Sequence, residues 1–146
     1  MILPILQDGD KRLLKKSKRV AKIDDSIREL AENLIETMRS NSGVGLSAPQ
    51  CGVLKQVIIV LIDGTSKVLI NPEIVFKSEE KVTDKEGCLS FNGEFYDISR
   101  AKEIVIKYRN LEGRPIKETH TDFTARVIQH EVDHLLGIVF KTYVDT

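Results

Sequence analysis

The chain has 146 residues, and its 22 Lys and Arg side chains balance its 22 Asp and Glu side chains. That length predicts one domain over residues 1–146, and the zero net charge argues against a strongly cationic nucleic-acid binder or a polybasic membrane-surface protein. Two cysteines are too few for a disulfide scaffold, and no apolar run approaches the roughly 20 residues that span a bilayer. We therefore expect a reducing, cytoplasmic location with no direct contact to nucleic acid or membrane.

The N-terminal part begins with an apolar arm and a basic segment. Residues 1–7 are apolar with one proline, which predicts an extended arm, and residues 10–19 predict a short helix or a loop. Over residues 27–38, apolar side chains recur at i, i+3, i+4 and i+7, which predicts an amphipathic helix with one face in the core. Ser26 and Glu29 fit a capping box at its start, and an Asn-Ser-Gly sequence ends it.

The next segment changes from a helical pattern to strand patterns. Residues 43–50 (GVGLSAPQ) contain two glycines and a proline, so they favour close backbone approach to a ligand or a strand over regular helix. Residues 57–62 are continuously apolar and rich in β-branched side chains, which predicts a central strand. The Asp63-Gly64 pair predicts a hairpin, with residues 68–70 as its return strand. Asn71-Pro72 is expected to end that strand.

Further strands are predicted in the second half. Residues 74–82 mix apolar and charged side chains, which predicts a more exposed strand. Residues 94–98 and 103–108 are strand candidates, the second with apolar alternation. Residues 114–121 are expected to be extended, and residues 138–140 are expected to form a last strand.

The last long element is a helix from Thr121 or Asp122 through Leu136, with Gly137 just beyond its end. Its apolar residues occupy most of its circumference, which predicts a buried helix. The order of elements therefore predicts an α+β fold, in which antiparallel or mixed β-sheets pack around this central buried helix and the amphipathic helix lies near the N-terminus.

The buried helix carries the sequence His-Glu-Val-Asp-His. Positions i and i+4 lie on the same face of a helix, so His130 and His134 can hold one metal ion between their rings. Glu131 is rotated by about 100° around the axis, where its carboxylate flanks the metal and suits a general base acting on bound water. Histidines on a buried helix need partners, which favours metal binding over two surface histidines.

A catalytic site of this type needs a third protein ligand and one open position. After Gly137 the only carboxylate, imidazole or thiol is Asp145, so we expect the third ligand upstream, among His120, Cys51, Cys88 and several carboxylates. Cys51 is expected to be a small buried apolar residue, and His120 an ordinary surface histidine. Cys88 follows a glycine that permits close backbone approach, although a purely apolar role for it is also open.

Three segments together carry a family resemblance. Residues 43–50 (GVGLSAPQ), 86–90 (EGCLS) and 129–134 (QHEVDH) resemble the three signature motifs of the peptide deformylase family, in the same order and at similar spacing. Agreement of three motifs is far more specific than H-E-x-x-H alone. The resemblance extends from the first residues to Phe140. It implies a metal-dependent hydrolase that removes the formyl group from N-formylmethionyl nascent peptides and releases formate.

The resemblance implies a role for the chemical groups at the metal. Cys88, His130 and His134 would bind one divalent ion, with water in the fourth position. Iron(II) is favoured, and zinc, nickel or cobalt also suit two imidazoles and a thiolate. Glu131 would take the proton from that water and pass it to the leaving amine.

Other residues would hold the substrate or brace the site. The Gln50 side-chain amide and the Leu89 backbone N–H would stabilise the oxyanion. Glu86 and Arg100 are expected to pair and to brace the loop that carries the cysteine. Asp133 is expected either to orient a histidine or make another contact behind the ligands, or to be a surface or capping carboxylate. By the same resemblance, the residues that contact the substrate would be Val44, Gly45, Phe123 and Val127.

The chain departs from the family pattern in a few places. Ser47 stands where alanine is usual, Asn92 where proline is common, and Phe95 where tyrosine or arginine is frequent. Many members continue into a C-terminal helix associated with ribosome docking, whereas this chain ends about six residues after Phe140. We therefore expect a short form of truncated, organellar or phage-borne type, in which any ribosome docking would use another surface.

Two other functions are weighed against the deformylase. One is another H-E-x-x-H metallohydrolase, such as a peptidase, and the other is a catalytically silent metal-binding or partner-binding module. The upstream Cys88 and the shortage of downstream ligands argue against the first. Glu131 and Gln50, which a binding module does not need, argue against the second.

Overall fold

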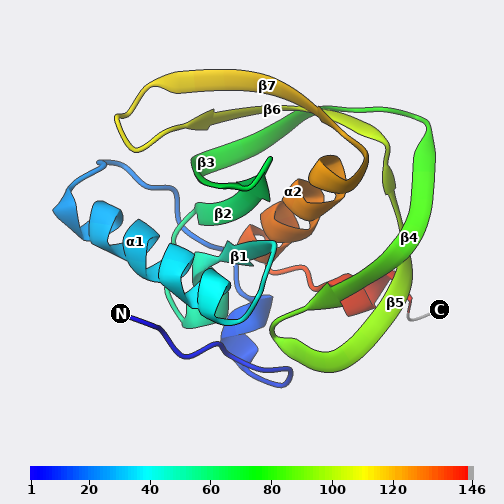
Figure 1. Ribbon diagram of the computed structural model, residues 1–146, viewed down its shortest axis with the longest axis horizontal. Coiled ribbons are helices and arrows are strands. Elements are labelled where there is room, and N and C mark those ends of the chain that lie inside the picture. The colour runs from blue at the N-terminus through cyan, green and yellow to red at the C-terminus, as the bar shows by residue number, and fades with distance from the viewer. Residues whose placement is uncertain (145–146) are drawn as a thin grey trace.

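A central helix lies between two antiparallel sheets in the computed structural model, which describes residues 1–144 (Figure 1). One sheet has the strand order β1-β2-β3-β6-β7, and β4 pairs with β5 in a separate hairpin. The elements are η1 (Lys11–Leu14), α1 (Asp25–Ser40), β1 (Gly45–Ser47), η2 (Ala48–Cys51), β2 (Val57–Ile62), β3 (Thr65–Lys77), β4 (Lys81–Cys88), β5 (Phe91–Ala101), β6 (Glu103–Arg109), β7 (Pro115–Thr121), α2 (Asp122–Leu135) and η3 (Phe140–Tyr143). The predicted α+β class is confirmed.

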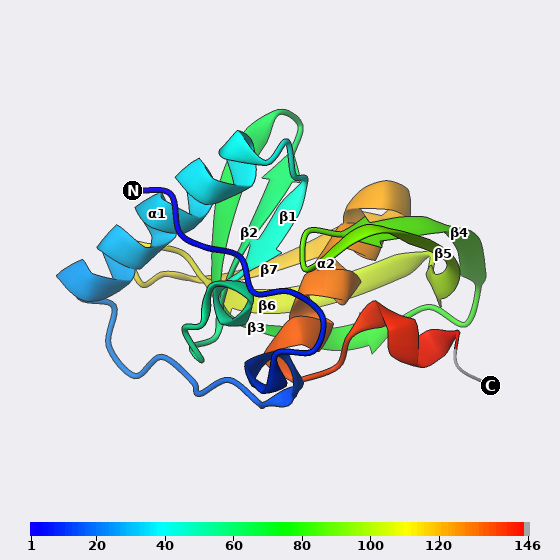
Figure 2. The same ribbon diagram turned by 90° about the horizontal axis from the view of Figure 1, so that it is seen from below.

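The five-stranded sheet separates two hydrophobic clusters because neighbouring residues of a strand face opposite sides. On β2, Val57 and Ile59 pack in the cluster that contains α1, whereas Ile58 and Val60 pack in the cluster that contains α2. Figure 2 shows this layering, with α1 on one side of β1 and β2 and α2 on the other. The continuous apolar run of β2 is therefore explained by burial of both its faces.

Helix α1 confirms the predicted amphipathic stripe but begins differently from the prediction. Its cap is Asp24, which has an extended backbone and whose carboxylate accepts a hydrogen bond from the backbone N–H of Ile27 at 3.2 Å. The hydroxyl of Ser26 donates to the same carboxylate at 2.6 Å, so the predicted capping box of Ser26 and Glu29 is wrong. A carboxylate at the first turn also interacts favourably with the helix dipole.

Strand β3 continues through Asn71-Pro72, where the sequence predicted an end. The register with β6 shifts between Ile70 and Glu73, so these residues form a bulge instead. Asn71 adopts the left-handed conformation that asparagine tolerates, with φ +53°. Its side-chain amide accepts from the Val20 N–H and donates to the Val20 carbonyl, each at 2.8 Å. The predicted strand over residues 74–82 is accordingly split between β3 and β4.

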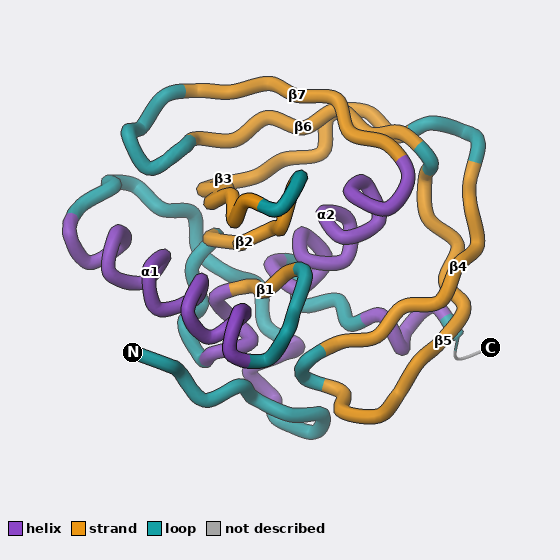
Figure 3. Tube along the Cα trace, viewed as in Figure 1, coloured by secondary structure: helices purple, strands orange, loops and turns teal. Residues whose placement is uncertain are grey.

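Helix α2 is buried along its length from Ala125 to Leu135, as the sequence predicted. Figure 3 shows it in the middle of the chain path, between the strands of the two sheets. The predicted last strand over residues 138–140 is wrong. The 3-10 helix η3 begins there, and Phe140 is buried through ring contacts with Phe91 and Tyr96 instead of strand pairing. Neither helix within residues 1–144 combines the length and the apolarity needed to cross a membrane.

Two glycines with left-handed backbone permit a matched test of packing at the end of α2. An added Cβ at Gly137 would lie 2.6 Å from the carbonyl oxygen of Leu14, whereas at Gly64 it would meet nothing within 4 Å. Their φ angles are +76° and +77°, so alanine at either position carries the same backbone cost of about 1–2 kcal/mol. We expect Gly137→Ala to lower the free energy of unfolding by about 1–3 kcal/mol more than Gly64→Ala, because a backbone clash is added. Urea titration measures both, and equal losses would contradict this packing.

Candidate functional site

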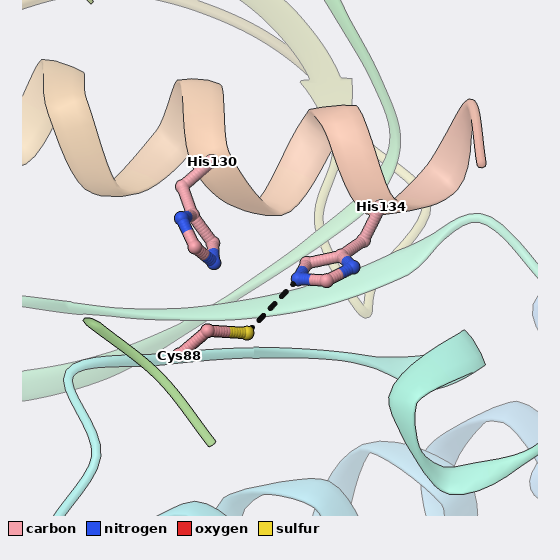
Figure 4. Close-up of side chains that lie close together, drawn as sticks. All are labelled: Cys88, His130 and His134. Carbon is pink, nitrogen blue, oxygen red and sulfur yellow. Dashed lines mark hydrogen bonds between the residues drawn. The ribbon is translucent and has the colours of Figure 1, made fainter. Parts of the chain in front are cut away.

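The three predicted metal ligands converge, although Cys88 comes from the β4–β5 hairpin and both histidines come from α2 (Figure 4). Their ligand atoms lie within 4.8 Å of one another, and Cys88 Sγ is 3.4 Å from His134 Nε2. A tetrahedral ion with metal–sulfur and metal–nitrogen bonds of about 2.3 and 2.0 Å would place those two atoms about 3.5 Å apart. The donor set therefore fits one divalent cation.

The ring of His130 is oriented by a carboxylate behind it. Its Nδ1 lies 2.9 Å from Glu86 Oε1, which leaves Nε2 to face the other ligands. Hydrogen bonding of a metal-ligating histidine to a carboxylate fixes its tautomer and ring orientation. Burial lowers the pKa of His130, but hydrogen bonds with Cys88 and Glu86 outweigh it and raise the pKa to about 10. A bound cation would take the place of that proton.

Glu86 is the centre of a buried ionic cluster. Arg100 donates to both its oxygens, at 2.8 and 2.9 Å, and Arg126 donates to Oε2 at 2.6 Å. Burial alone would raise the pKa of Glu86, but the hydrogen bonds from Arg100 and His130 lower it to about 2. The expected pair of Glu86 and Arg100 is therefore present, and it is part of a larger cluster.

Asp133 belongs to this cluster and does not contact a histidine through any hydrogen bond of the described residues. Its Oδ2 accepts from Arg100 Nη1 at 2.7 Å and from the Tyr143 hydroxyl at 2.7 Å. The expected surface position of Asp133 is wrong, because its side chain is buried against these two donors. The other expectation, a contact behind the metal-binding histidines, agrees with its bond to Arg100, which in turn holds Glu86.

Glu131 lines the cleft, and no hydrogen bond links it to the ionic cluster within the described residues. Its Oε1 is buried without a hydrogen-bond partner among the described residues, and burial raises its pKa to about 7. An added Cβ at Gly45 would lie 2.6 Å from Glu131 Oε2 and 2.8 Å from Val127 Cγ1. The close approach expected for the glycine-rich loop is therefore found at Gly45, where any larger residue would displace the carboxylate.

Gln50 lies next to the cysteine and is held in one orientation. Its Oε1 accepts from the Ser47 backbone N–H at 3.0 Å and from the Ser47 hydroxyl at 2.9 Å. Its Nε2 donates to Ser90 Oγ at 3.1 Å and lies 3.5 Å from Cys88 Sγ. Serine at position 47, where alanine is usual in the family that the motifs resemble, thus directs the amide N–H group toward Cys88.

A cleft of about 380 Å³ opens beside these groups. Val127 in its wall is 7% exposed, whereas Val44 and Phe123 at its mouth are 42% and 59% exposed. The structure brings together in this cleft the predicted residues Val44, Gly45, Gln50, Cys88, Leu89, Phe123, Val127, His130 and Glu131. The cleft thus joins an apolar wall to a set of polar and metal-binding groups.

The remaining candidates lie elsewhere, and one important residue was not predicted. His120 is on β7, where its Nε2 is 3.5 Å from Glu118 Oε2, and Cys51 is half-buried, which raises the pKa of its thiol to about 11. Asp145 is outside the described residues.

Arg126 was missed, although a charged residue one turn before His130 on a buried helix is itself a signal of a required partner.

The chain is similar to known proteins in both sequence and fold. The family model described as polypeptide deformylase matches residues 2–146. A peptide deformylase from Pseudothermotoga lettingae is 46% identical over 140 residues, which cover 96% of this chain and 81% of that protein. The crystal structure of a peptide deformylase from Ehrlichia chaffeensis matches with a TM-score of 0.97 and 38% identity, over 100% of this chain and 89% of that chain. A class I type b peptide deformylase from Acinetobacter baumannii with Met-Ala-Ser bound matches with a TM-score of 0.95 and 33% identity, over 98% of each chain.

The two cysteines allow a matched test of the ligand set. Cys88 lies in the group of possible ligands with the two histidines, and Cys51 lies outside it in the described part of the chain. We expect Cys88→Ala to weaken Co²⁺ binding by more than about 100-fold, because a ligand itself is lost and not only its orientation. Cys51→Ala should bind Co²⁺ as the parent protein does. Calorimetric titration of metal-free protein measures both, and equal affinities of the two variants would contradict this ligand set.

Proposed function

The chain belongs to the polypeptide deformylase family, and we propose how its own residues carry out the reaction of that family. The enzyme hydrolyses the amide bond between a formyl group and the N-terminal methionine of a nascent peptide. Water adds across that C–N bond, so the products are formate and a peptide with a free amino terminus. The observation that carries the proposal is the meeting of the Cys88, His130 and His134 donors with Glu131 and Gln50 beside one cleft.

Cys88, His130 and His134 hold the metal ion. A divalent cation supplies Lewis acidity, which makes water acidic near neutral pH and polarises the formyl oxygen. We propose iron(II) as the native ion, in keeping with the resemblance of the motifs, and the same two imidazoles and thiolate also accept zinc, nickel and cobalt. Metal analysis of protein purified without oxygen tests the identity of the ion.

Glu131 moves the proton. Its Oε1 is buried next to His130 in sequence and has no hydrogen-bond partner in residues 1–144, so it is free to accept a proton from the attacking water. The same carboxyl group then releases that proton to the methionine nitrogen as the C–N bond breaks. Because an added Cβ at Gly45 would press on Glu131 Oε2, glycine at this position leaves the carboxylate the space it needs.

Gln50 and Leu89 stabilise the negative charge that develops on the formyl oxygen. The Gln50 amide N–H group is turned toward Cys88 by the bonds that Ser47 makes to its oxygen. The backbone N–H of Leu89 is the second donor, immediately after the cysteine. Loss of one such donor typically lowers the rate by about 10²–10³-fold, so both orientation and proximity of these groups matter.

The substrate lies along β1 with its methionine in the cleft. β1 is the edge strand of its sheet, so a peptide can add beside Gly45 as a further strand. The methionine side chain packs against Val44, Phe123 and Val127. The structure of the related enzyme from Acinetobacter baumannii has Met-Ala-Ser bound, which supports a peptide that begins with methionine as the ligand.

Replacing the general base gives the principal test. We expect Glu131→Gln to lower kcat for formate release from formyl-Met-Ala-Ser by about 10²–10⁴-fold, while Co²⁺ affinity changes little because Glu131 is not a ligand. Glu36→Gln, at an exposed carboxylate on α1, serves as the control with parental activity. Undiminished formate release by Glu131→Gln would refute this mechanism. Cleavage of unformylated Met-Ala-Ser by the parent enzyme would favour a peptidase.

Ser47 offers a finer test of the oxyanion donor. Ser47→Ala removes the hydroxyl bond to Gln50 Oε1 and keeps the backbone N–H bond. We expect kcat to fall by about 2–10-fold with KM nearly unchanged, as for the loss of one net hydrogen bond. Ser66→Ala removes a buried hydroxyl that has no partner among the described residues, so it should leave kcat unchanged. A fall in KM with kcat unchanged for Ser47→Ala would contradict this role.

A further inference from the structure

Arg126 connects the metal-binding helix to both strands of the hairpin that carries Cys88. It lies on α2 one turn before His130 and is 5% exposed. Its Nη1 donates to Glu86 Oε2 at 2.6 Å and to the Ile98 carbonyl at 2.8 Å, and its Nη2 donates to the Val82 carbonyl at 2.6 Å. One rigid guanidinium thus reaches a main-chain carbonyl of β4, a main-chain carbonyl of β5 and the carboxylate of Glu86 on β4.

The charges of the cluster show why two arginines are needed. Glu86 accepts from Arg100, Arg126 and His130, whereas Arg100 also donates to Asp133. Two buried carboxylates therefore face two guanidiniums. Without Arg126, Arg100 would be the one guanidinium shared between two carboxylates within the described residues. A buried charge without its partner is strongly unfavourable, so Glu86 would move toward water or toward Arg100.

A movement of Glu86 would displace two of the proposed metal ligands, Cys88 and His130. Glu86 is two residues before Cys88 on the same strand, and its other oxygen holds His130 Nδ1 at 2.9 Å. The distance between the hairpin and the helix therefore determines both the place of the thiol and the direction of one imidazole. Metal sites need ligand positions within about 0.2 Å of their preferred distances.

We propose that Arg126 is a positioning residue that fixes Cys88 relative to His130 and His134, and so determines how firmly the metal ion is retained. The inference rests on the proposed ligand set, and it goes beyond that set because Arg126 carries no ligand atom itself. Arg126 also lines the cleft. A role in the cleft wall alone would change substrate binding, whereas the positioning role changes the metal site in the absence of substrate.

The test uses Arg126→Met, which keeps the length of the side chain and removes its charge and donors, and Arg126→Lys, which keeps the charge and loses the forked geometry. Arg114→Met, at an exposed position between β6 and β7, is the control. Each full-length protein is loaded with Co²⁺, and its thiolate-to-cobalt and d–d absorption bands, its rate of Co²⁺ release to a chelator and its melting temperature without metal are measured.

We expect Arg126→Met to release Co²⁺ about 10–100-fold faster than the parent, as for loss of an outer partner of a metal ligand, with shifted d–d bands. The rate of Co²⁺ release from Arg126→Lys should lie between those of the parent and of Arg126→Met. If Arg126→Met does not fold, Arg126→Lys is the variant that tests the proposal. Arg114→Met should match the parent.

Unchanged absorption bands and release rates with only a lower melting temperature would overturn the proposal, because Arg126 would then support the fold alone. A changed KM for formyl-Met-Ala-Ser with unchanged Co²⁺ release would overturn it in favour of the cleft wall. Absence of the thiolate-to-cobalt band in the parent protein would instead show that the proposed ligand set has failed, and the inference would fall with it.

Discussion

The fold depends on burying six polar side chains of one helix, α2. Those side chains are Arg126, Gln129, His130, Glu131, Asp133 and His134, each at most 8% exposed. A buried polar group without a partner costs about 1–3 kcal/mol, so the surroundings of α2 must supply partners. The β4–β5 hairpin supplies most of them, through Glu86, Arg100 and main-chain groups. A two-stranded sheet is marginal by itself, so the helix and the hairpin each make the other possible.

The buried ionic cluster fixes the alignment of the β4–β5 hairpin against α2 more than it stabilises the fold. Replacing buried ion pairs by apolar residues is often neutral or stabilising, whereas removing one partner is strongly destabilising. Bonds from Arg100 and Arg126 have fixed directions, so they permit one alignment of the hairpin against α2, in which Glu86 meets His130. Apolar packing would tolerate sliding of the hairpin along the helix. The polar cluster thus places Cys88, which lies on a separate sheet, next to the two histidines of α2.

Sequence patterns predicted the parts of the fold whose cause is local. The periodicity of α1 and the run of β2 follow from burial of one or two faces, and both were predictable. The continuation of β3 through Asn71 was not, because it depends on a bond to Val20, 51 residues away. In the site, the motifs indicated the three donors that converge, but Arg126 makes its bonds to carbonyls that lie 28 and 44 residues from it in the chain. Such partners become visible only when the hairpin has been placed against the helix.

The buried polar groups of α2 divide into those that are satisfied by the protein and those that are left for a ligand. Gln129 is saturated by the backbone of Ala101 and Ala125, and Arg126 uses its donors on the hairpin. Within the described residues, Glu131 Oε1 has no partner, and neither has His134 Nδ1, the ring nitrogen on the side away from Cys88. A fixed donor on that oxygen would stabilise the fold, and it would also remove the carboxylate from proton transfer. An unsatisfied carboxylate held beside Gly45 is therefore a stability cost that the proposed role of Glu131 in proton transfer would explain, as is common at active sites.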